Sequence, residues 1–164
     1  MDVQNIETNS QQLDELVTAL IGDKAVELDN YMTTVRACLS NTNQVSNEDL
    51  HLISLRLGVF MYALIDHVEK LNVRKGVSKE QAVYSENDAL LKSTGTVQEK
   101  KAKAENLTVE DRLKHIAYST ATSILYKKID GANTILSTIK NVLSSRKQEQ
   151  VLTNMATSSV GGAF

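Results

Sequence analysis

The sequence lacks proline and tryptophan altogether, and only 4% of its 164 residues are aromatic. Proline is the strongest helix breaker, so its absence leaves long helices as the default for a chain rich in leucine, alanine, lysine, glutamate and glutamine. The shortage of aromatic residues removes the largest core anchors, which favours burial of apolar surface between chains. We therefore predict an all-α protein of long amphipathic helices that form a bundle or hairpin and self-assemble.

Cysteine is nearly absent too. The single residue of this type, Cys38, excludes an intramolecular disulfide, and its apolar helical surroundings predict a buried, inert thiol. The N-terminus has neither a basic region nor an apolar run, and no window approaches the ~20 apolar residues of a membrane-spanning helix. We expect a soluble cytoplasmic protein in a reducing compartment, with no membrane partner.

Catalytic and metal-binding motifs are also missing. Glu48 and His51 form one E-x-x-H, whereas a dimetal carboxylate bundle needs two such pairs and further carboxylates. His67 lies near an apolar seam beside Asp66, which indicates a packed histidine, and His115 is expected at the surface. There is no G-x-S-x-G, P-loop, paired cysteine set or glycine-rich phosphate loop. The sequence predicts no enzyme activity, no cofactor and no metal.

Apolar residues recur at helical spacing in three stretches of the chain. The first stretch predicts a helix over about residues 12–40, with Gly22 as a weak point, inside an acidic N-terminal region of residues 1–45. The polar run SNTNQVSN ends this helix. Ser46 and Asp49 then have the spacing of a capping box, which marks the start of the next helix.

The second stretch is a regular seam typical of a bundle or coiled coil. It consists of Leu50, Ile53, Leu57, Phe60, Leu64, Val68 and Leu71. After Leu71 the apolar residues move to roughly the opposite side of the helix, at ~100° per residue; they are Val73, Val77, Tyr84 and Leu91. Either the helix breaks between Asn72 and Gly76, or it continues and meets a new partner. We favour one long helix.

A polar linker at residues 93–108 follows. Its first residues, STGT, stop the helix, and QEKKAKAE has high helix propensity without an apolar stripe, so it forms either a solvated helix or a mobile arm. Thr108, with Asp111 as a weak capping box, opens the last helix. Residues 46–147 are expected to form the helical core, and residues 148–164 a disordered tail.

The last helix has the widest apolar face. Its residues step alternately by four and three, and the face is broad enough to touch two neighbours. Gly131 beside Ala132 would permit close approach of another backbone. We expect neighbouring chains to complete the burial of this face, so the predicted oligomerisation residues are Leu125, Ile129, Leu136, Ile139 and Leu143.

Charge is distributed unevenly along the chain, although the net charge is only -2. Residues 1–69 hold eleven acids and three bases, whereas residues 112–147 hold seven bases and one acid. This asymmetry can serve contact with the acidic half of the same or a neighbouring chain, or binding of an anionic ligand. For the second reading, the candidate nucleic-acid-binding residues are Arg74, Lys75, Lys79, Tyr84, Lys100, Lys101, Lys103, Lys127 and Lys128.

The order of "FMYALIDHVEK" and "KEQAVYSEND", a polar break, and "SILYKKIDGANTILSTIKNVLSSR" resembles the phage recombination mediator family of the UvsY type, over about residues 57–147. The resemblance implies a ring-forming α-helical homo-oligomer that binds single-stranded DNA. It also implies two protein partners, a recombinase that is loaded and a single-strand-binding protein that is displaced. The location would then be the cytoplasm of the host cell.

On this resemblance, the family's basic segment falls on Arg74, Lys75, Lys79 and Tyr84, and its oligomerising helix on the apolar face between Leu125 and Leu143. The chain differs in having one tyrosine where the family shows a pair, and in its acidic N-terminal helix. The alternative is a non-enzymatic helical structural or assembly protein, such as a phage virion or scaffold component, that acts through protein–protein contacts.

Overall fold

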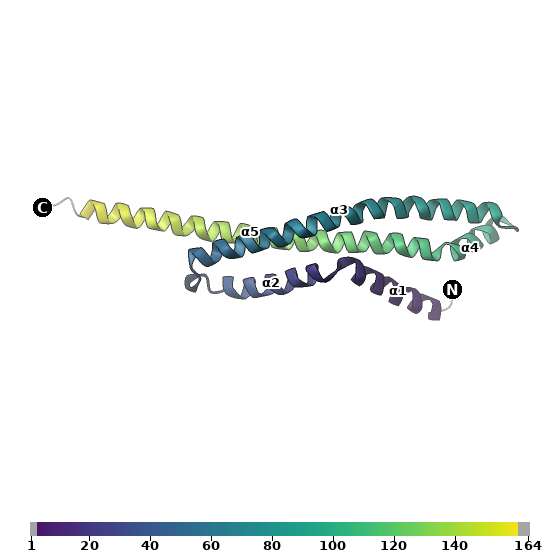
Figure 1. The fold of residues 1–164 in the computed structure, drawn as a ribbon, viewed down its shortest axis with the longest axis horizontal. Coiled ribbons are helices and arrows are strands. Elements are labelled where there is room, and N and C mark those ends of the chain that lie inside the picture. Colours follow the sequence, from purple (N-terminus) through teal and green to yellow (C-terminus); the bar gives the residue numbers. More distant parts are fainter. Residues whose placement is uncertain (1–2, 161–164) are drawn as a thin grey trace.

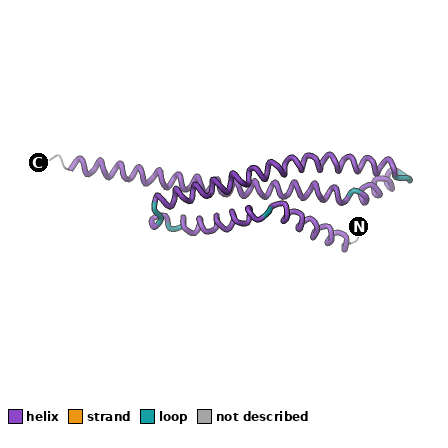
Figure 2. The backbone as a smooth tube through the Cα atoms, viewed as in Figure 1, coloured by secondary structure: helices purple, strands orange, loops and turns teal. Residues whose placement is uncertain are grey.

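The computed structural model describes residues 3–160, with the side chains of residues 7–42 and 44–155. This part of the chain is all-α, as predicted, and short loops connect the helices (Figure 2). The elements in chain order are α1 (Val3–Ile21), α2 (Asp23–Leu39), a 3₁₀ turn η1 (Thr42–Gln44), α3 (Asn47–Lys92), α4 (Val97–Leu107) and α5 (Val109–Val160).

Two long helices dominate the fold: α3 and α5 pack against each other as an antiparallel hairpin (Figure 1). α4 lies at the closed end of the hairpin, and α1 and α2 follow one another along α5 in the direction in which α5 runs. α5 is the central helix because it contacts each of the other four. The result is an elongated three-helix bundle, beyond which α5 continues alone (Figure 1).

The core has the heptad spacing that the sequence indicates. On α3, Leu50, Leu57, Leu64 and Leu71 recur every seven residues, and each is fully buried. Such spacing keeps one side of a helix against its partner over several turns. The rest of the large buried side chains come from α2, α3 and α5, and they are Leu28, Val35, Val68, Leu125 and Ile139.

α3 is one continuous helix through Asn72, which confirms the alternative that we favoured. Past Leu71, however, polar pairs join it to α5. The amide of Asn72 donates to the Tyr126 hydroxyl at 2.9 Å, and the Ser85 hydroxyl donates to the Asp111 carboxylate at 2.6 Å. The distal half of the hairpin is thus held by polar contacts and small residues, and it leaves the later apolar residues of α3 outside.

The predicted helix over residues 12–40 is in fact two helices, α1 and α2. Gly22 separates them with a φ of +71°, a left-handed conformation that glycine adopts at little cost. The sequence marked Gly22 as a weak point, but apolar spacing continued on both sides and hid the break. The division lets α1 and α2 follow different stretches of α5.

Two helix starts were predicted with different success. The Ser46 hydroxyl accepts a hydrogen bond from the Asp49 amide at 3.0 Å, which confirms the cap of α3. α5 begins directly after Thr108, but the expected capping box is absent there. The Thr108 hydroxyl donates instead to the Ala104 carbonyl at 2.9 Å, because Thr108 also ends α4.

The stretch QEKKAKAE is a helix, α4, which was one of its two predicted forms. Its start is a capping box that the sequence reading missed: Glu99 accepts from the Thr96 amide at 2.7 Å, and Thr96 accepts from the Glu99 amide at 3.3 Å. The hydrogen bond from the Thr96 amide is the main reason that the pKa of Glu99 lies below its ordinary value. This cap fixes where α4 leaves the turn.

The expected disordered tail from Gln148 is instead helical as far as Val160, and residues 161–164 lie outside the described residues. No proline or glycine occurs between Gln148 and Val160, so nothing in the local sequence stops α5. Past Arg146, which binds Asn47 at the start of α3, α5 extends beyond the other helices (Figure 1).

Candidate functional site

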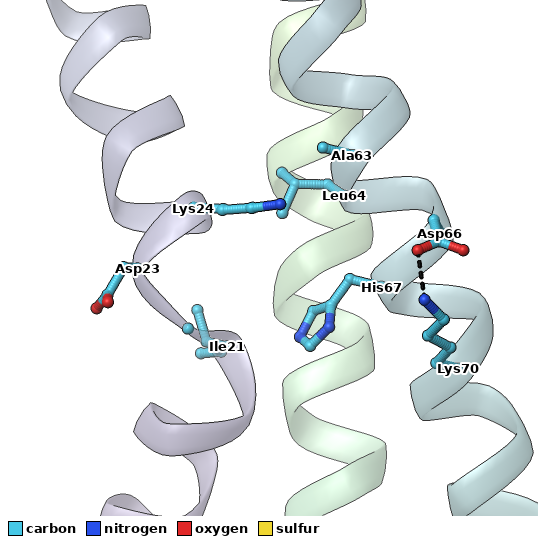
Figure 3. Close-up of a pocket in the computed structure, with 9 residues that line it drawn as sticks. Ile21, Asp23, Lys24, Ala63, Leu64, Asp66, His67 and Lys70 are labelled. Atoms are coloured by element: carbon cyan, nitrogen blue, oxygen red, sulfur yellow. Dashed lines mark hydrogen bonds and ion pairs between the residues drawn. The ribbon is translucent and has the colours of Figure 1, made fainter.

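A recess of about 280 Å³ lies at the kink between α1 and α2 (Figure 3). Lys24 on one side and His67 on the other are among the polar side chains that line it. The imidazole of His67 donates through Nε2 to the Leu20 carbonyl at 2.7 Å. That carbonyl belongs to the last turn of α1, where backbone oxygens lack partners within the helix.

Residues that line the recess therefore stabilise the kink through hydrogen bonds within the chain. His67 is occupied by the backbone of α1, and Lys70 binds Asp66 at 2.7 Å on the same helix. This agrees with the prediction of a packed histidine. Within residues 3–160, no group of three histidine, cysteine, aspartate or glutamate side chains is placed to hold a metal ion.

Replacing His67 with leucine should loosen the kink. The half-buried Leu20 carbonyl would lose its partner, which costs about 1–3 kcal/mol. Amide hydrogen exchange should quicken mainly in residues 17–24. His51→Leu is the matched control, because His51 is exposed on the same helix and has no hydrogen bond to another helix among the described residues. Equal exchange in both variants would contradict this role of His67.

The other residues considered for chemistry do not converge. Glu48 and His51 are exposed on the first turns of α3, and His115 is half-buried near Ser78 instead of lying at the surface. Cys38 is exposed, so the predicted buried thiol was wrong. The seam of α2 passes through Val35 and then Leu39, which leaves Cys38 on the outer side.

The candidate nucleic-acid-binding residues lie in three separate places. Four are on the distal half of α3, the three lysines at positions 100, 101 and 103 are on α4, and the remaining two are on α5. Even on α3 they diverge, since Lys75 and Lys79 lie about 100° and 140° around the helix from Arg74. Tyr84 lies about 80° from Arg74, in the direction away from Lys75. The described residues therefore form no single basic stripe.

Part of this basic charge is used inside the chain. Lys128 of α5 forms an ion pair with Asp29 of α2, and the Lys128 side chain is only 18% exposed. Lys103 donates to the Thr94 carbonyl at 3.0 Å, and Arg146 donates to the Thr42 carbonyl. Lys128 thus pairs with an acid from residues 1–69, and Lys103 and Arg146 bind backbone carbonyls of the same chain. Pairing with acids of the same chain was one of the two interpretations of the uneven charge.

The predicted oligomerisation residues lie in the core of the single chain. Leu125, Ile129 and Ile139 are buried, and Leu136 and Leu143 are half-buried against the same cluster. The apolar face of α5 is as wide as expected, but α1, α2 and α3 cover it. At Gly131 the close neighbour is the Met32 side chain of α2, at 3.7 Å from the position of a Cβ atom. Leu125, Ile129 and Ile139 are therefore already covered within one chain, whereas Leu136 and Leu143 stay partly exposed.

The exposed apolar surface lies on α3 instead, on the side that faces away from the core. We call it the outer stripe. Successive residues turn by 100°, so its members fall within a sector of about 80°, opposite the buried heptad. Eight large apolar side chains, each between 52% and 86% exposed, make up the outer stripe: Leu52, Leu55, Val59, Tyr62, Val73, Val77, Tyr84 and Leu91.

By length and composition alone, α3 is long and apolar enough to cross a membrane. Only 17% of its most apolar stretch is buried inside the protein. From the sequence we expected no stretch to approach the apolar length of a membrane-spanning helix. That expectation overlooked that α3 has apolar residues on two sides. Soluble single chains seldom leave this many large apolar side chains on one side of a helix in water, although the charged residues Asp66, Lys70, Glu80 and Asp88 lie among them. The outer stripe is therefore the best candidate for a functional surface among the described residues.

Searches against protein-family models, curated proteins and solved structures found no match to this chain. The resemblance to recombination mediators therefore stays a prediction.

Proposed function

We propose that this chain is a non-enzymatic helical assembly protein, and that it works through protein–protein contact along the outer stripe of α3. The observation that carries the proposal is the row of eight exposed apolar side chains between Leu52 and Leu91, on a helix whose opposite side already packs into the core. An assembly protein needs a long, well-packed helical body with an exposed apolar surface, and the α3–α5 hairpin has both. The dispersed histidines and acids give no support to a catalytic role.

The energetics favour such contact. Full burial of a large apolar side chain contributes about 1.5–3 kcal/mol, whereas association of two proteins costs about 4–15 kcal/mol. Partial burial of eight such side chains per chain thus exceeds the cost of association. The outer stripe also spans about 60 Å of helix from Leu52 to Leu91, which suits a long partner surface.

A single-stranded-DNA-binding mediator that helps load a recombinase is the second candidate. The observation in its favour is that the candidate cations other than Lys128 form no ion pair with the described residues. Tyr84 is 69% exposed and could stack on a base. Assembly through the outer stripe would repeat these cations along the complex.

The test is a charge introduced into the outer stripe. In Leu55→Glu/Val59→Glu, the carboxylates would be buried without partners in any complex, and the dissociation constant should rise at least about 100-fold. Light scattering should then give the 18.1 kDa mass of one chain. Thr134→Glu/Ser137→Glu is the control on exposed positions of α5, and it should keep the wild-type mass.

Circular dichroism should show unchanged helix content in both variants, because all four positions are exposed. If the outer-stripe variant keeps the wild-type mass, the proposal fails. A labelled single-stranded oligonucleotide, added at two salt concentrations, tests the second candidate in the same samples. A mediator should bind it with a steep loss in salt, and Lys75→Glu/Lys79→Glu should weaken that binding.

A further inference from the structure

We infer that the end of α5 that extends beyond the bundle docks, head to tail, into a groove between α1 and α5 of a second copy of this chain. We call residues 147–155, which follow Arg146, the projecting end. The inference rests on the proposed function, because this contact acts between chains that the outer stripe has already brought together. It adds a second surface and a direction to the assembly.

The projecting end has an apolar side that faces away from its own bundle. Val151, Leu152 and Met155 are 45%, 66% and 65% exposed, and at 100° per residue they fall within a sector of about 100°. Met155 lies about 160° around α5 from Ile139, which is fully buried in the core. Another chain can therefore approach this apolar side without meeting the bundle to which it belongs.

A groove of about 400 Å³ lies between α1 and the first turns of α5, which begin at the closed end of the hairpin (Figure 1). We call it the α1–α5 groove. Its apolar wall consists of Leu16, Ala19 and Leu113, and Leu16 is 39% exposed. Its polar residues are Gln12, Glu15, Glu110 and Lys114.

The projecting end cannot reach the α1–α5 groove of its own chain. α5 is one continuous helix, in which Leu113 and Val151 are about 57 Å apart along the axis. The two surfaces thus lie toward opposite ends of the elongated molecule (Figure 1). Only a second copy can bring them together, and such contact between unlike surfaces leaves one of each for further copies.

The two surfaces match when the projecting end enters the groove parallel to α1. If Val151 lies level with Leu16 of the second copy, Met155 comes close to the level of Ala19 of the second copy. Lys147 then lies level with Gln12 of the second copy, toward the closed end of that hairpin. Apolar side chains meet apolar ones inside the groove, and the polar side chains meet where the projecting end enters it.

The charge of the groove favours this occupant. Glu15 and Glu110 line the groove together with one cation, Lys114, which binds Glu110 at 2.7 Å. Glu15 forms no ion pair among the described residues. One further cation would therefore balance the two carboxylates, and Lys147 of the incoming chain lies within one helical turn of the level of Glu15.

The charges of the projecting end are placed to suit. Lys147 lies about 40° around the helix from Val151, so it borders the apolar side. Glu149 is the one acid among residues 147–155, and it lies about 160° from Val151, away from the groove. Lys147 is exposed and has no ion pair among the described residues. The cation thus faces the carboxylates of the second copy, and the acid does not.

This contact is small. It uses three large apolar side chains of the projecting end, whereas the outer stripe has eight, so it does not overcome the cost of association by itself. Between chains that the outer stripe already joins, the effective concentration of one surface near the other is far higher. Chains with a disrupted outer stripe should therefore stay monomeric although their projecting ends are intact.

Site-specific cross-linking tests the contact. All chains carry Cys38→Ser, because the exposed native thiol would otherwise react. Leu16→Cys and Val151→Cys chains are prepared separately, mixed at a concentration at which light scattering shows association, and oxidised. The mixture should give about tenfold or more disulfide-linked dimer than either chain alone. Thr18→Cys is the control for Leu16→Cys, because Thr18 is exposed about 160° around α1 from Leu16 and should not link.

A charge exchange between the two chains tests the predicted pairing. Glu15→Lys in the Leu16→Cys chain, or Lys147→Glu in the Val151→Cys chain, should each lower the yield of linked dimer about threefold or more. Both changes together should restore the yield, because the opposite charges face each other again. Glu15 and Lys147 are exposed, so neither change should alter the helix content.

Association of the chains without a link between Leu16→Cys and Val151→Cys would overturn this inference and leave the proposed function standing. Linking of Val151→Cys chains to one another would show that two projecting ends pair together, and it would overturn the inference as well. Wild-type chain that stays monomeric at every concentration would overturn the proposed function and, with it, the head-to-tail contact.

Discussion

Leu64→Ala is expected to lower the free energy of unfolding by about 2–5 kcal/mol, whereas Leu55→Ala on the same helix should change it by no more than about 0.5 kcal/mol in dilute solution. Leu64 is 1% exposed and belongs to the buried heptad of α3, so alanine leaves a cavity there. Leu55 is 67% exposed on the outer stripe, so alanine leaves no cavity there in a single chain.

Urea unfolding followed by circular dichroism measures both values at a concentration where the chain is monomeric. Leu64 and Leu55 lie in the same helix and undergo the same chemical change, so helix propensity cancels between them. A loss at Leu55 as large as that at Leu64 would show that both sides of α3 are buried within one chain. The outer stripe would then not exist in solution.

Ile139→Asp is expected to unfold the chain rather than release folded monomers. Ile139 is fully buried in the cluster that α2, α3 and α5 share, and an unpaired carboxylate there costs about 3–5 kcal/mol. That is a large fraction of the about 5–15 kcal/mol that stabilises a typical domain. The sequence alone had assigned this position to a contact between chains.

Circular dichroism and light scattering on the same sample separate the two roles of Ile139. Ser137→Asp is the matched control, since Ser137 is exposed two residues earlier on α5 and should tolerate the charge. A folded, helical monomer of Ile139→Asp would restore the interchain role of this face. Loss of helical signal in Ile139→Asp alone is the expected outcome.

Local signals in the sequence predicted most of the fold. Three signals each act over one or a few helical turns: the absence of proline, the seven-residue recurrence from Leu50 to Leu71, and the cap at Ser46. The structure confirms the long helices, the buried seam and the helix start that they predicted. The break at Gly22 was noted but given too little weight. A positive φ at one glycine is a local choice that apolar spacing does not reveal.

The candidate functional surface was harder to predict, because a periodic pattern shows that a side chain is apolar but not which partner covers it. The wide face of α5 was assigned to another chain, although α1 and α2 return along it. On α3 the change of phase at Val73 was visible, and a new partner was one of the two readings. The outer residues from Leu52 to Tyr62 were missed because the inner seam dominates that segment.

Ion pairs between residues far apart in the sequence were equally hard to predict. Asp29 and Lys128 are far apart in sequence, and only the path of α2 along α5 brings them together. The asymmetry of acids and bases was therefore visible in the sequence, but its use inside one chain was not.

The most direct measurement for the role of the outer stripe is the mass of the wild-type chain by light scattering across a concentration series. If the outer stripe joins copies of this chain, the mass should rise from that of one 18.1 kDa chain toward twice that value or more at micromolar concentration, with helix content unchanged. A mass of 18.1 kDa at every concentration, for chain that is fully folded, would contradict self-assembly through the outer stripe.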